Sequence, residues 1–138
     1  MYLLMTKKEL ANSLHDAKYN CAQSVACAFA EEIGVDKEVL FRACEGLGLG
    51  MGCMNGTCGA ISGAVVLAGF RSSDGHLDAP ASKQATYKLS KEIMDRFEAK
   101  NKATICRDLK GVDTGCMLRS CPGCIEDAVE IVQEVLGL

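Results

Sequence analysis

Apolar residues recur along the chain at intervals of three and four, which is the period of an amphipathic α-helix. The first segments of this kind are residues 6–17 and 20–33, and the longest runs from 81 to about 100. Polar and apolar residues nowhere alternate with a period of two, so we expect no β-strands. The predicted core face of the longest helix comprises Ala85, Leu89, Ile93 and Phe97.

A glycine-rich segment precedes an apolar one in the middle of the chain. Residues 46–56 contain five glycines, and we expect a loop there because glycine destabilises a helix. Residues 58–70 are apolar on nearly every side of a helix, which predicts a buried central helix. With a short helix after Asp36 and a last helix after Ser120, the pattern predicts an all-α bundle. We expect about five to six helices in a single domain over residues 1–138.

Composition and charge exclude several classes of protein. With 15 Lys and Arg against 18 Asp and Glu, the net charge is −3, which is not typical of a nucleic-acid-binding protein. The apolar run at residues 60–70 is too short to cross a membrane, and the first residues do not form a signal peptide. We therefore expect a cytoplasmic protein that binds neither nucleic acid nor membranes.

The chain has nine cysteines. An odd number cannot close into a complete set of disulfides. In the reducing cytoplasm, thiols serve metal binding or redox chemistry more often than disulfide cross-linking. The positions of the cysteines are therefore the main indication of function in this sequence.

Four cysteines follow a residue that can cap a helix, so each is predicted in the first turn of a helix. Free N–H groups and the positive end of the helix dipole stabilise a thiolate there. Four such helix starts could converge on one metal site, although a single cysteine can equally serve as a small buried apolar residue. These cysteines, each with its predicted cap, are Cys21 (Asn20), Cys58 (Thr57), Cys106 (Thr104) and Cys121 (Ser120).

Cys124 and Cys53 allow two other arrangements of the site. Cys121 and Cys124 form a C-x-x-C pair, which is typical of a redox disulfide or of half a metal site. Together with Cys53 and Cys58 they could complete a site of four thiolates for zinc or an iron–sulfur cluster. Cys27 is interpreted as a partly exposed bystander on its helix.

The histidines give little support for acid–base catalysis or haem binding. His15 and His76 are interpreted as ordinary surface residues. Ile125, rather than a histidine, follows Cys124, so the covalent attachment motif of c-type haem is missing.

Five short motifs occur in order over residues 17–136. They are Asn20-Cys21-Ala-Gln-Ser-Val25, Gly50-Met-Gly52, Cys58-Gly-Ala-Ile-Ser-Gly63-Ala64, Cys106-Arg-Asp-Leu109 and Cys121-Pro122. In this order they resemble the bacterial family of redox-active proteins named for the cysteine pattern C_GCAxxG_C_C. The resemblance implies a small helical protein of the cytoplasm, common in anaerobes. It also implies that Cys21, Cys58, Cys106 and Cys121 are the functional cysteines.

The match departs from the family pattern at one point. The family name has Gly-Cys-Ala-x-x-Gly, whereas this chain has Cys58-Gly-Ala-x-x-Gly63. This difference leaves Cys53 as a candidate substitute for Cys58. The chain is also similar to part of the split-Soret c-type cytochromes, although it lacks their haem-attachment motif.

Three functions are compatible with the sequence. The first is a metal centre, foremost an iron–sulfur cluster, that Cys21, Cys58, Cys106 and Cys121 would hold for electron transfer or redox sensing. The second is metal-free thiol–disulfide chemistry that uses Cys121 with Cys124, or a pair from two helices. The third is a structural zinc site in an interaction module. The partner would be an electron donor or acceptor, and a homodimer is compatible with a smooth, glycine-containing helix at 58–70.

Overall fold

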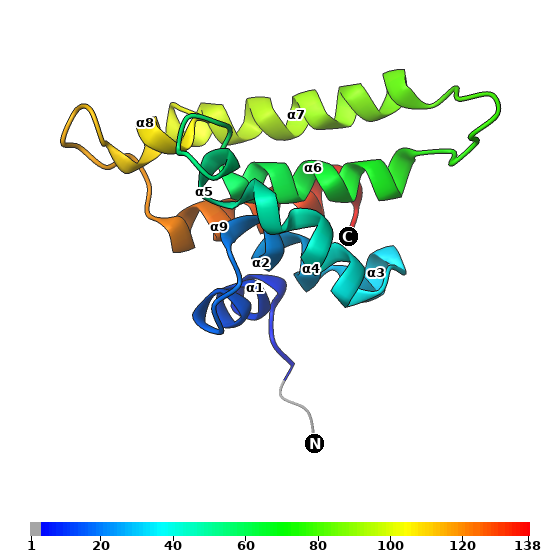
Figure 1. Ribbon diagram of the computed structural model, residues 1–138, viewed down its shortest axis with the longest axis horizontal. Coiled ribbons are helices and arrows are strands. Elements are labelled where there is room, and N and C mark those ends of the chain that lie inside the picture. The colour runs from blue at the N-terminus through cyan, green and yellow to red at the C-terminus, as the bar shows by residue number, and fades with distance from the viewer. Residues whose placement is uncertain (1–3) are drawn as a thin grey trace.

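The computed structural model describes residues 4–138, and the chain folds there into helices joined by short loops (Figure 1). Within these residues no strand forms, and the one isolated β-bridge joins Thr57 to Ile105. The prediction of an all-α fold is confirmed. The helices are α1 (Lys7–Asp16), α2 (Cys21–Ala28), α3 (Ala30–Ile33), α4 (Lys37–Cys44), the 3₁₀-helix η1 (Glu45–Leu47), α5 (Gly48–Met51), α6 (Gly59–Ser72), α7 (Lys83–Asn101), α8 (Cys106–Lys110) and α9 (Cys121–Leu136).

The chain contains more helices than expected because two predicted segments are interrupted. The helix predicted over residues 20–33 breaks at Phe29, whose φ and ψ of −110° and 15° separate α2 from α3. The predicted glycine loop contains two short helical turns, η1 and α5. Leu49 and Gly50 within α5 nevertheless have left-handed backbone angles, so this segment is not a regular helix.

Helix α6 lies at the centre of the fold, between α7 on one side and α2 and α9 on the other (Figure 1). Its approach to α2 depends on Gly63, since a Cβ atom there would lie 2.5 Å from the backbone oxygen of Ala22. Helix α1 packs across α2 and α9. The buried residues of α6 are Gly59, Ala60, Ile61, Gly63, Ala64, Leu67 and Ala68, as expected for a central helix.

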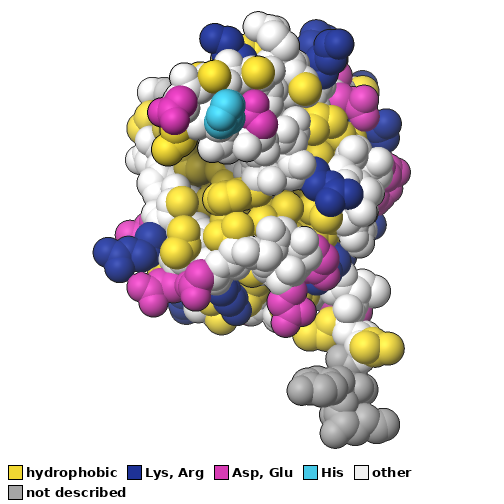
Figure 2. Space-filling view, turned by 90° about the vertical axis from the view of Figure 1, so that its right-hand side faces the viewer, with side chains coloured by type: hydrophobic (Ala, Val, Ile, Leu, Met, Phe, Trp, Pro, Cys, Tyr) yellow, Lys and Arg dark blue, Asp and Glu magenta, His cyan; other side chains and the backbone are white. Residues whose placement is uncertain are grey.

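Burial of α6 is incomplete, however. Val65 and Val66 are only partly buried, and 49% of Phe70 is exposed. Figure 2 shows apolar side chains gathered on a hollowed face at this end of the molecule. The prediction that α6 is buried on all sides is therefore only partly right.

The long helix α7 contacts the core with its second half only. Ile93 and Phe97 are buried, Leu89 is half-buried and Ala85 is exposed. The first half of α7 lies along the end of α6 at the edge of the fold (Figure 1), and the predicted core position of Ala85 is wrong.

The described helices include none that is both long and apolar enough to cross a bilayer.

Candidate functional site

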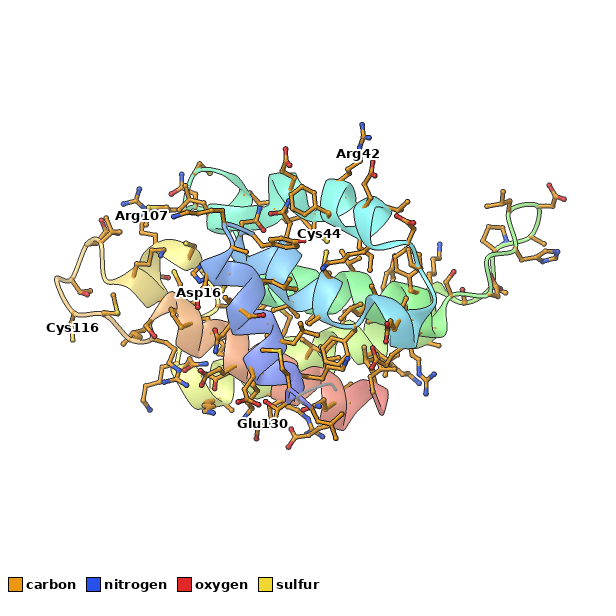
Figure 3. The ribbon with its side chains drawn as sticks, turned by 90° about the horizontal axis from the view of Figure 1, so that it is seen from below. Asp16, Arg42, Cys44, Arg107, Cys116 and Glu130 are labelled. Carbon is orange, nitrogen blue, oxygen red and sulfur yellow. The ribbon has the colours of Figure 1, made fainter. Side chains whose placement is uncertain are left out.

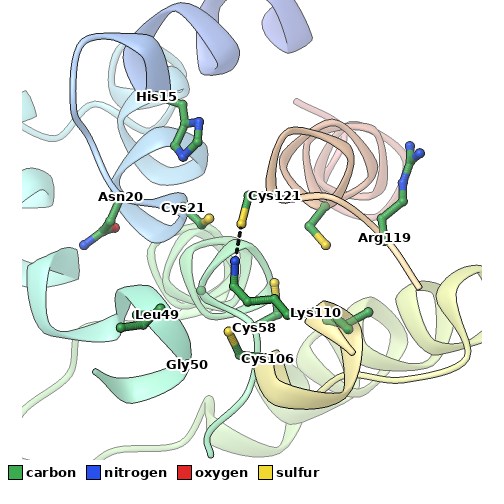
Figure 4. A pocket seen from close by; sticks show the side chains of 13 residues that line it. His15, Asn20, Cys21, Leu49, Gly50, Cys58, Cys106, Lys110, Arg119 and Cys121 are labelled. Atoms are coloured by element: carbon green, nitrogen blue, oxygen red, sulfur yellow. Dashed lines mark hydrogen bonds between the residues drawn. The ribbon is translucent and has the colours of Figure 1, made fainter. Parts of the chain in front are cut away.

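A pocket of about 200 Å³ lies where several helices begin, and cysteine side chains line much of it (Figure 4). The cysteines come from segments far apart in the sequence. Cys21 is the first residue of α2, Cys58 caps α6 and Cys106 is the first residue of α8. Cys121 and Cys124 lie in the first turn of α9. The structure thus brings together all four of the cysteines that the sequence singled out, and adds Cys124 as a fifth.

Two of the four predicted caps are present. The Asn20 side chain accepts a hydrogen bond from the Gln23 N–H at 2.8 Å, and the Ser120 hydroxyl accepts one from the Gly123 N–H at 3.1 Å. These bonds satisfy N–H groups in the first turns of α2 and α9 and set where the helices begin. Cys21 and Cys121 therefore start their helices as predicted.

The caps predicted at Thr57 and Thr104 are wrong. Thr57 pairs with Ile105 in the isolated β-bridge, and the Cys58 N–H donates to the Thr104 carbonyl at 2.8 Å. The two threonines are therefore extended and use their backbones rather than their side chains. The bridge joins the segments before α6 and α8, and so positions Cys58 and Cys106 together at the pocket.

The glycine-rich segment forms one wall of the pocket. The Cys106 N–H donates to the Gly56 carbonyl at 3.0 Å, which ties this segment to the start of α8. Gly50 has φ of 56°, and a Cβ atom there would lie 2.4 Å from the Cβ of Cys106. Only glycine combines this backbone conformation with so close an approach.

Lys110 and Cys21 both stabilise the thiolate form of Cys121. The Lys110 ammonium group donates to the Cys121 sulfur at 2.6 Å (Figure 4). The neighbouring Cys21 thiol and the hydrogen bond and charge of Lys110 lower the pKa of Cys121 to about 5. The same contact with Cys121, together with burial, raises the pKa of Cys21. At neutral pH, Cys121 is thus the thiolate of this pair and Cys21 is the thiol.

Cys58 and Cys124 form a second pair of the same kind. The Cys124 thiol and, next to it, the backbone N–H groups of Ala60 and Ile61 lower the pKa of Cys58 despite its burial. The neighbouring Cys58 and burial raise the pKa of Cys124.

The expectation of a lowered pKa at all four helix starts is thus wrong for two cysteines. The neighbouring Cys121 and burial raise the pKa of Cys21, and burial raises the pKa of Cys106. Cys106 begins α8, which has only five residues and therefore a weak helix dipole.

The sequence did not predict that three basic residues line the pocket. His15 is half-buried at the pocket instead of on the surface, and Lys110 and Arg119 line it as well. Lys110 ends α8, one helical turn after Cys106. The i, i+4 spacing of these two residues was the one feature of the sequence that could have placed Lys110 at the pocket.

Arg119 holds its part of the pocket wall through a buried carboxylate. Its guanidinium group donates two hydrogen bonds to Asp127, at 3.0 and 3.2 Å, and Asp127 is only 2% exposed. Lys100 and Asn101 of α7 donate to the same carboxylate, at 2.6 and 3.0 Å. A Cβ atom on Gly123 would lie 2.5 Å from Arg119 Nε, so Gly123 leaves the space that this side chain occupies.

The remaining cysteines lie away from the pocket. Cys53 and Cys116 are exposed, and Figure 3 shows Cys116 at the outer end of the loop between α8 and α9. Cys27 and Cys44 are buried in the core. Cys27 is thus not the partly exposed bystander that the sequence predicted, because α4 covers this side of α2. Burial raises the pKa of Cys44 to about 11.

The pocket matches a metal centre in the chemistry of its donors. Sulfur ligands from cysteine are those that bind zinc and iron–sulfur clusters, and five cysteines line this pocket. In the part of the chain that the structure describes, however, no three His, Cys, Asp or Glu side chains are arranged as ligands of a single ion.

Comparison with known proteins gives one result. The family model described as "Putative redox-active protein (C_GCAxxG_C_C)" matches residues 19–135. No curated protein and no solved structure gives a significant match. This chain has Cys58-Gly59 where the family name has Gly-Cys, and the structure fits that order. Cys58 lines the pocket, whereas a Cβ atom on Gly59 would lie 3.2 Å from the Cα of Gly48. The matched region covers the helices that supply all five pocket cysteines, and the chain belongs to the C_GCAxxG_C_C family of redox-active proteins.

Proposed function

We propose that the protein carries a redox-active iron–sulfur centre, held by cysteines of the pocket, for electron transfer or redox sensing. The supporting observation is the convergence of thiols from four separate segments on one pocket of about 200 Å³. A disulfide requires two cysteines, whereas a cluster commonly takes four. The proposed ligands are Cys21, Cys58, Cys106 and Cys121.

Several features of the pocket suit this role. Cys58 and Cys121 both have lowered pKa values, and metal ligation requires thiolates. Lys110 adds a positive charge beside Cys121 that offsets the negative charge of several thiolates. A bound cluster would supply one-electron redox chemistry, whose potential depends on charge, hydrogen bonds and solvent exposure.

The experiment is an iron and acid-labile sulfide analysis of protein purified without oxygen, together with a visible absorption spectrum. Cys106→Ser should lose most of the iron, because Cys106 is buried at the pocket. Cys53→Ser is the matched control and should keep it, since Cys53 is exposed outside the pocket. Wild-type protein without iron and sulfide, or Cys106→Ser with unchanged iron, would contradict the proposal. Stoichiometric zinc in place of iron would instead favour a structural zinc site.

A second candidate is metal-free thiol–disulfide chemistry, and two pairs of neighbouring cysteines in the pocket favour it. In each pair one sulfur has a lowered pKa and its partner a raised one, at Cys121 with Cys21 and at Cys58 with Cys124. The thiolate would attack an oxidised disulfide partner, and the neighbouring thiol would then close the protein disulfide. The protein gives up two electrons and the proton of the closing thiol, and the partner takes these up with a second proton from water to become two thiols.

This alternative uses pairs from two helices rather than the C-x-x-C pair of Cys121 and Cys124. It predicts that a small-molecule disulfide lowers the count of free thiols by two per closed pair, and that a thiol reductant restores it. Cys124→Ser should abolish closure at Cys58 and leave closure at Cys121. An unchanged thiol count in the wild type would exclude the mechanism.

Under either chemistry the electron partner is expected at the mouth of the pocket. Leu49 lines the pocket and is 51% exposed, and Leu118, next to the pocket residue Arg119, is 44% exposed. Such apolar rims are typical of transient protein contacts. We infer a cytoplasmic location, because a reducing compartment keeps the exposed thiols of Cys53 and Cys116 free.

A further inference from the structure

Three groups of different chemistry meet within the cysteine pocket (Figure 4). Cys121 begins α9, Cys21 begins α2 and Lys110 ends α8. The Lys110 Nζ atom lies 2.6 Å from the Cys121 sulfur, and the Cys21 thiol is a second neighbour of that sulfur. The arrangement combines a nucleophilic sulfur, a cationic hydrogen-bond donor and a second thiol.

The position of Lys110 indicates which kind of bond this sulfur is suited to break. An ammonium group has three N–H donors, and the Cys121 sulfur accepts from one of them. Another can bond to the atom that leaves when the sulfur attacks. A thiol, with a pKa of about 8.5, leaves readily as the thiolate. Water has a pKa of about 15.7, so hydroxide leaves slowly unless a donor stabilises it. The cation is therefore better matched to an oxygen leaving group than to a sulfur one.

The size and lining of the pocket favour a small substrate. Its volume is about 200 Å³, whereas pockets for drug-sized ligands measure about 300–1,000 Å³. Cys21 and Cys121 are both half-buried there. A disulfide of a folded protein would have to enter this space together with its flanking backbone, but a small hydroperoxide enters as a free molecule. Among the described residues no Asp or Glu lines the pocket, so no carboxylate there competes with the substrate for Lys110.

We propose that the pocket reduces small hydroperoxides, with Cys121 as the attacking sulfur, Lys110 as the donor to the leaving oxygen and Cys21 as the thiol that closes the disulfide. The activity rests on the metal-free thiol chemistry given above as the second candidate. It deepens that candidate by naming the oxidant, which is a hydroperoxide rather than a disulfide.

The reaction has two steps. The Cys121 thiolate attacks the terminal oxygen of the hydroperoxide, so that an S–O bond forms, the O–O bond breaks and Cys121 becomes a sulfenic acid. The leaving alkoxide, or hydroxide from hydrogen peroxide, takes a proton from water. The Cys21 thiol then attacks the sulfenic acid, an S–S bond forms and water leaves. The hydroperoxide gains the two electrons that the two cysteines lose, and an external thiol reductant restores both thiols.

The test compares two reactions of Cys121 in full-length, reduced, metal-free protein by mass spectrometry of its peptide. Hydrogen peroxide releases hydroxide, which needs a donor, whereas iodoacetamide releases iodide, which does not. Both reagents consume the same thiolate, so the ratio of the two rates is independent of the amount of thiolate. This ratio should exceed that of free cysteine about a hundredfold, which is the order expected for one hydrogen-bond donor.

Lys110→Gln should remove most of this excess, because the ammonium donor is lost. Lys88→Gln, at an exposed position of α7, is the matched control and should keep the ratio of the wild type. Circular dichroism would establish that both variants are folded. A wild-type ratio no higher than that of free cysteine would overturn the proposal. A ratio that is unchanged in folded Lys110→Gln would overturn it as well.

The products of the reaction give a second, independent readout. Hydrogen peroxide should link the Cys21 and Cys121 peptides of the wild type through a disulfide. In Cys21→Ser, dimedone present during the reaction should instead trap the sulfenic acid at Cys121. Cys116→Ser, exposed outside the pocket, should form the same disulfide as the wild type. A wild type that closes this disulfide with a small-molecule disulfide but not with hydrogen peroxide would overturn the proposal and leave the thiol–disulfide chemistry intact. Closure with neither oxidant would overturn both.

Discussion

The ammonium group of Lys110 lies 2.6 Å from the sulfur of Cys121, although the two residues belong to different helices. A charged donor at this distance favours the thiolate over the thiol. The contact therefore makes Cys121 a reactive sulfur at neutral pH, whether it binds a metal or attacks a disulfide.

Lys110→Gln should raise the pKa of Cys121 from about 5, because the substitution removes a positive charge that favours the thiolate. In metal-free, reduced protein, the rate of alkylation of Cys121 should rise with pH through a higher midpoint than in the wild type. A lost contact of about 1.4 kcal/mol corresponds to about a tenfold lower rate below that midpoint. Mass spectrometry of the Cys121 peptide after timed alkylation at about pH 4, which lies below both midpoints, measures this effect. Lys88→Gln, on an exposed position of α7, should leave the rate unchanged.

Asp127→Asn should destabilise the protein, because it leaves the guanidinium group of Arg119 and the Lys100 ammonium group without their shared carboxylate. Because these two cations are partly exposed to water, the loss of their charged hydrogen bonds costs about 2 kcal/mol, which urea unfolding of metal-free protein would measure. Glu134→Gln on the same helix is the control. Its partner Arg96 is 45% exposed, so it should cost less than about 1 kcal/mol.

The Asp127 carboxylate should also make the stability of the protein depend on pH. Burial by itself would raise the pKa of Asp127, but Arg119, Lys100 and Asn101 outweigh it and lower the pKa below 3.8. A lowered pKa in the folded state means that the stabilisation is present above the ordinary carboxyl pKa and is lost as the pH falls through the folded value. Between about pH 5 and pH 2, the free energy of unfolding should fall more steeply in the wild type than in Asp127→Asn. If the free energy of unfolding fell equally with pH in both proteins, Asp127 would not be the cause of the acid sensitivity.

Gly50→Ala should distort the pocket wall. The substitution strains a residue with φ of 56° and adds a Cβ atom 2.4 Å from that of Cys106. The left-handed conformation alone costs about 1–2 kcal/mol for a residue other than glycine. Gly46→Ala is a matched control within the same glycine-rich segment, because it meets no atom within 4 Å. The free energy of unfolding in urea should fall and the alkylation rate of Cys106 should change in Gly50→Ala. Neither quantity should change in Gly46→Ala.

Part of the site could be predicted because its signals are local. Asn20 and Ser120 cap α2 and α9 through N–H groups only three residues away, so the positions of Cys21 and Cys121 follow from a few neighbouring residues. Thr57 and Thr104 show where such reasoning fails. They carry the same type of side chain, but pairing across 48 positions of the chain, between 57 and 105, determines their conformation.

By itself, the sequence determined that the protein is helical and that Cys21 and Cys121 begin helices, because helical periodicity and capping depend on residues within a few positions of each other. Only the tertiary structure decided which sulfurs meet. Cys21 reaches Cys121, and Cys58 reaches Cys124, because α6 approaches α2 through Gly63 and Ala22 and α9 packs across both. The close packing of side chains between helices sets these contacts, and no local pattern in the chain encodes that geometry.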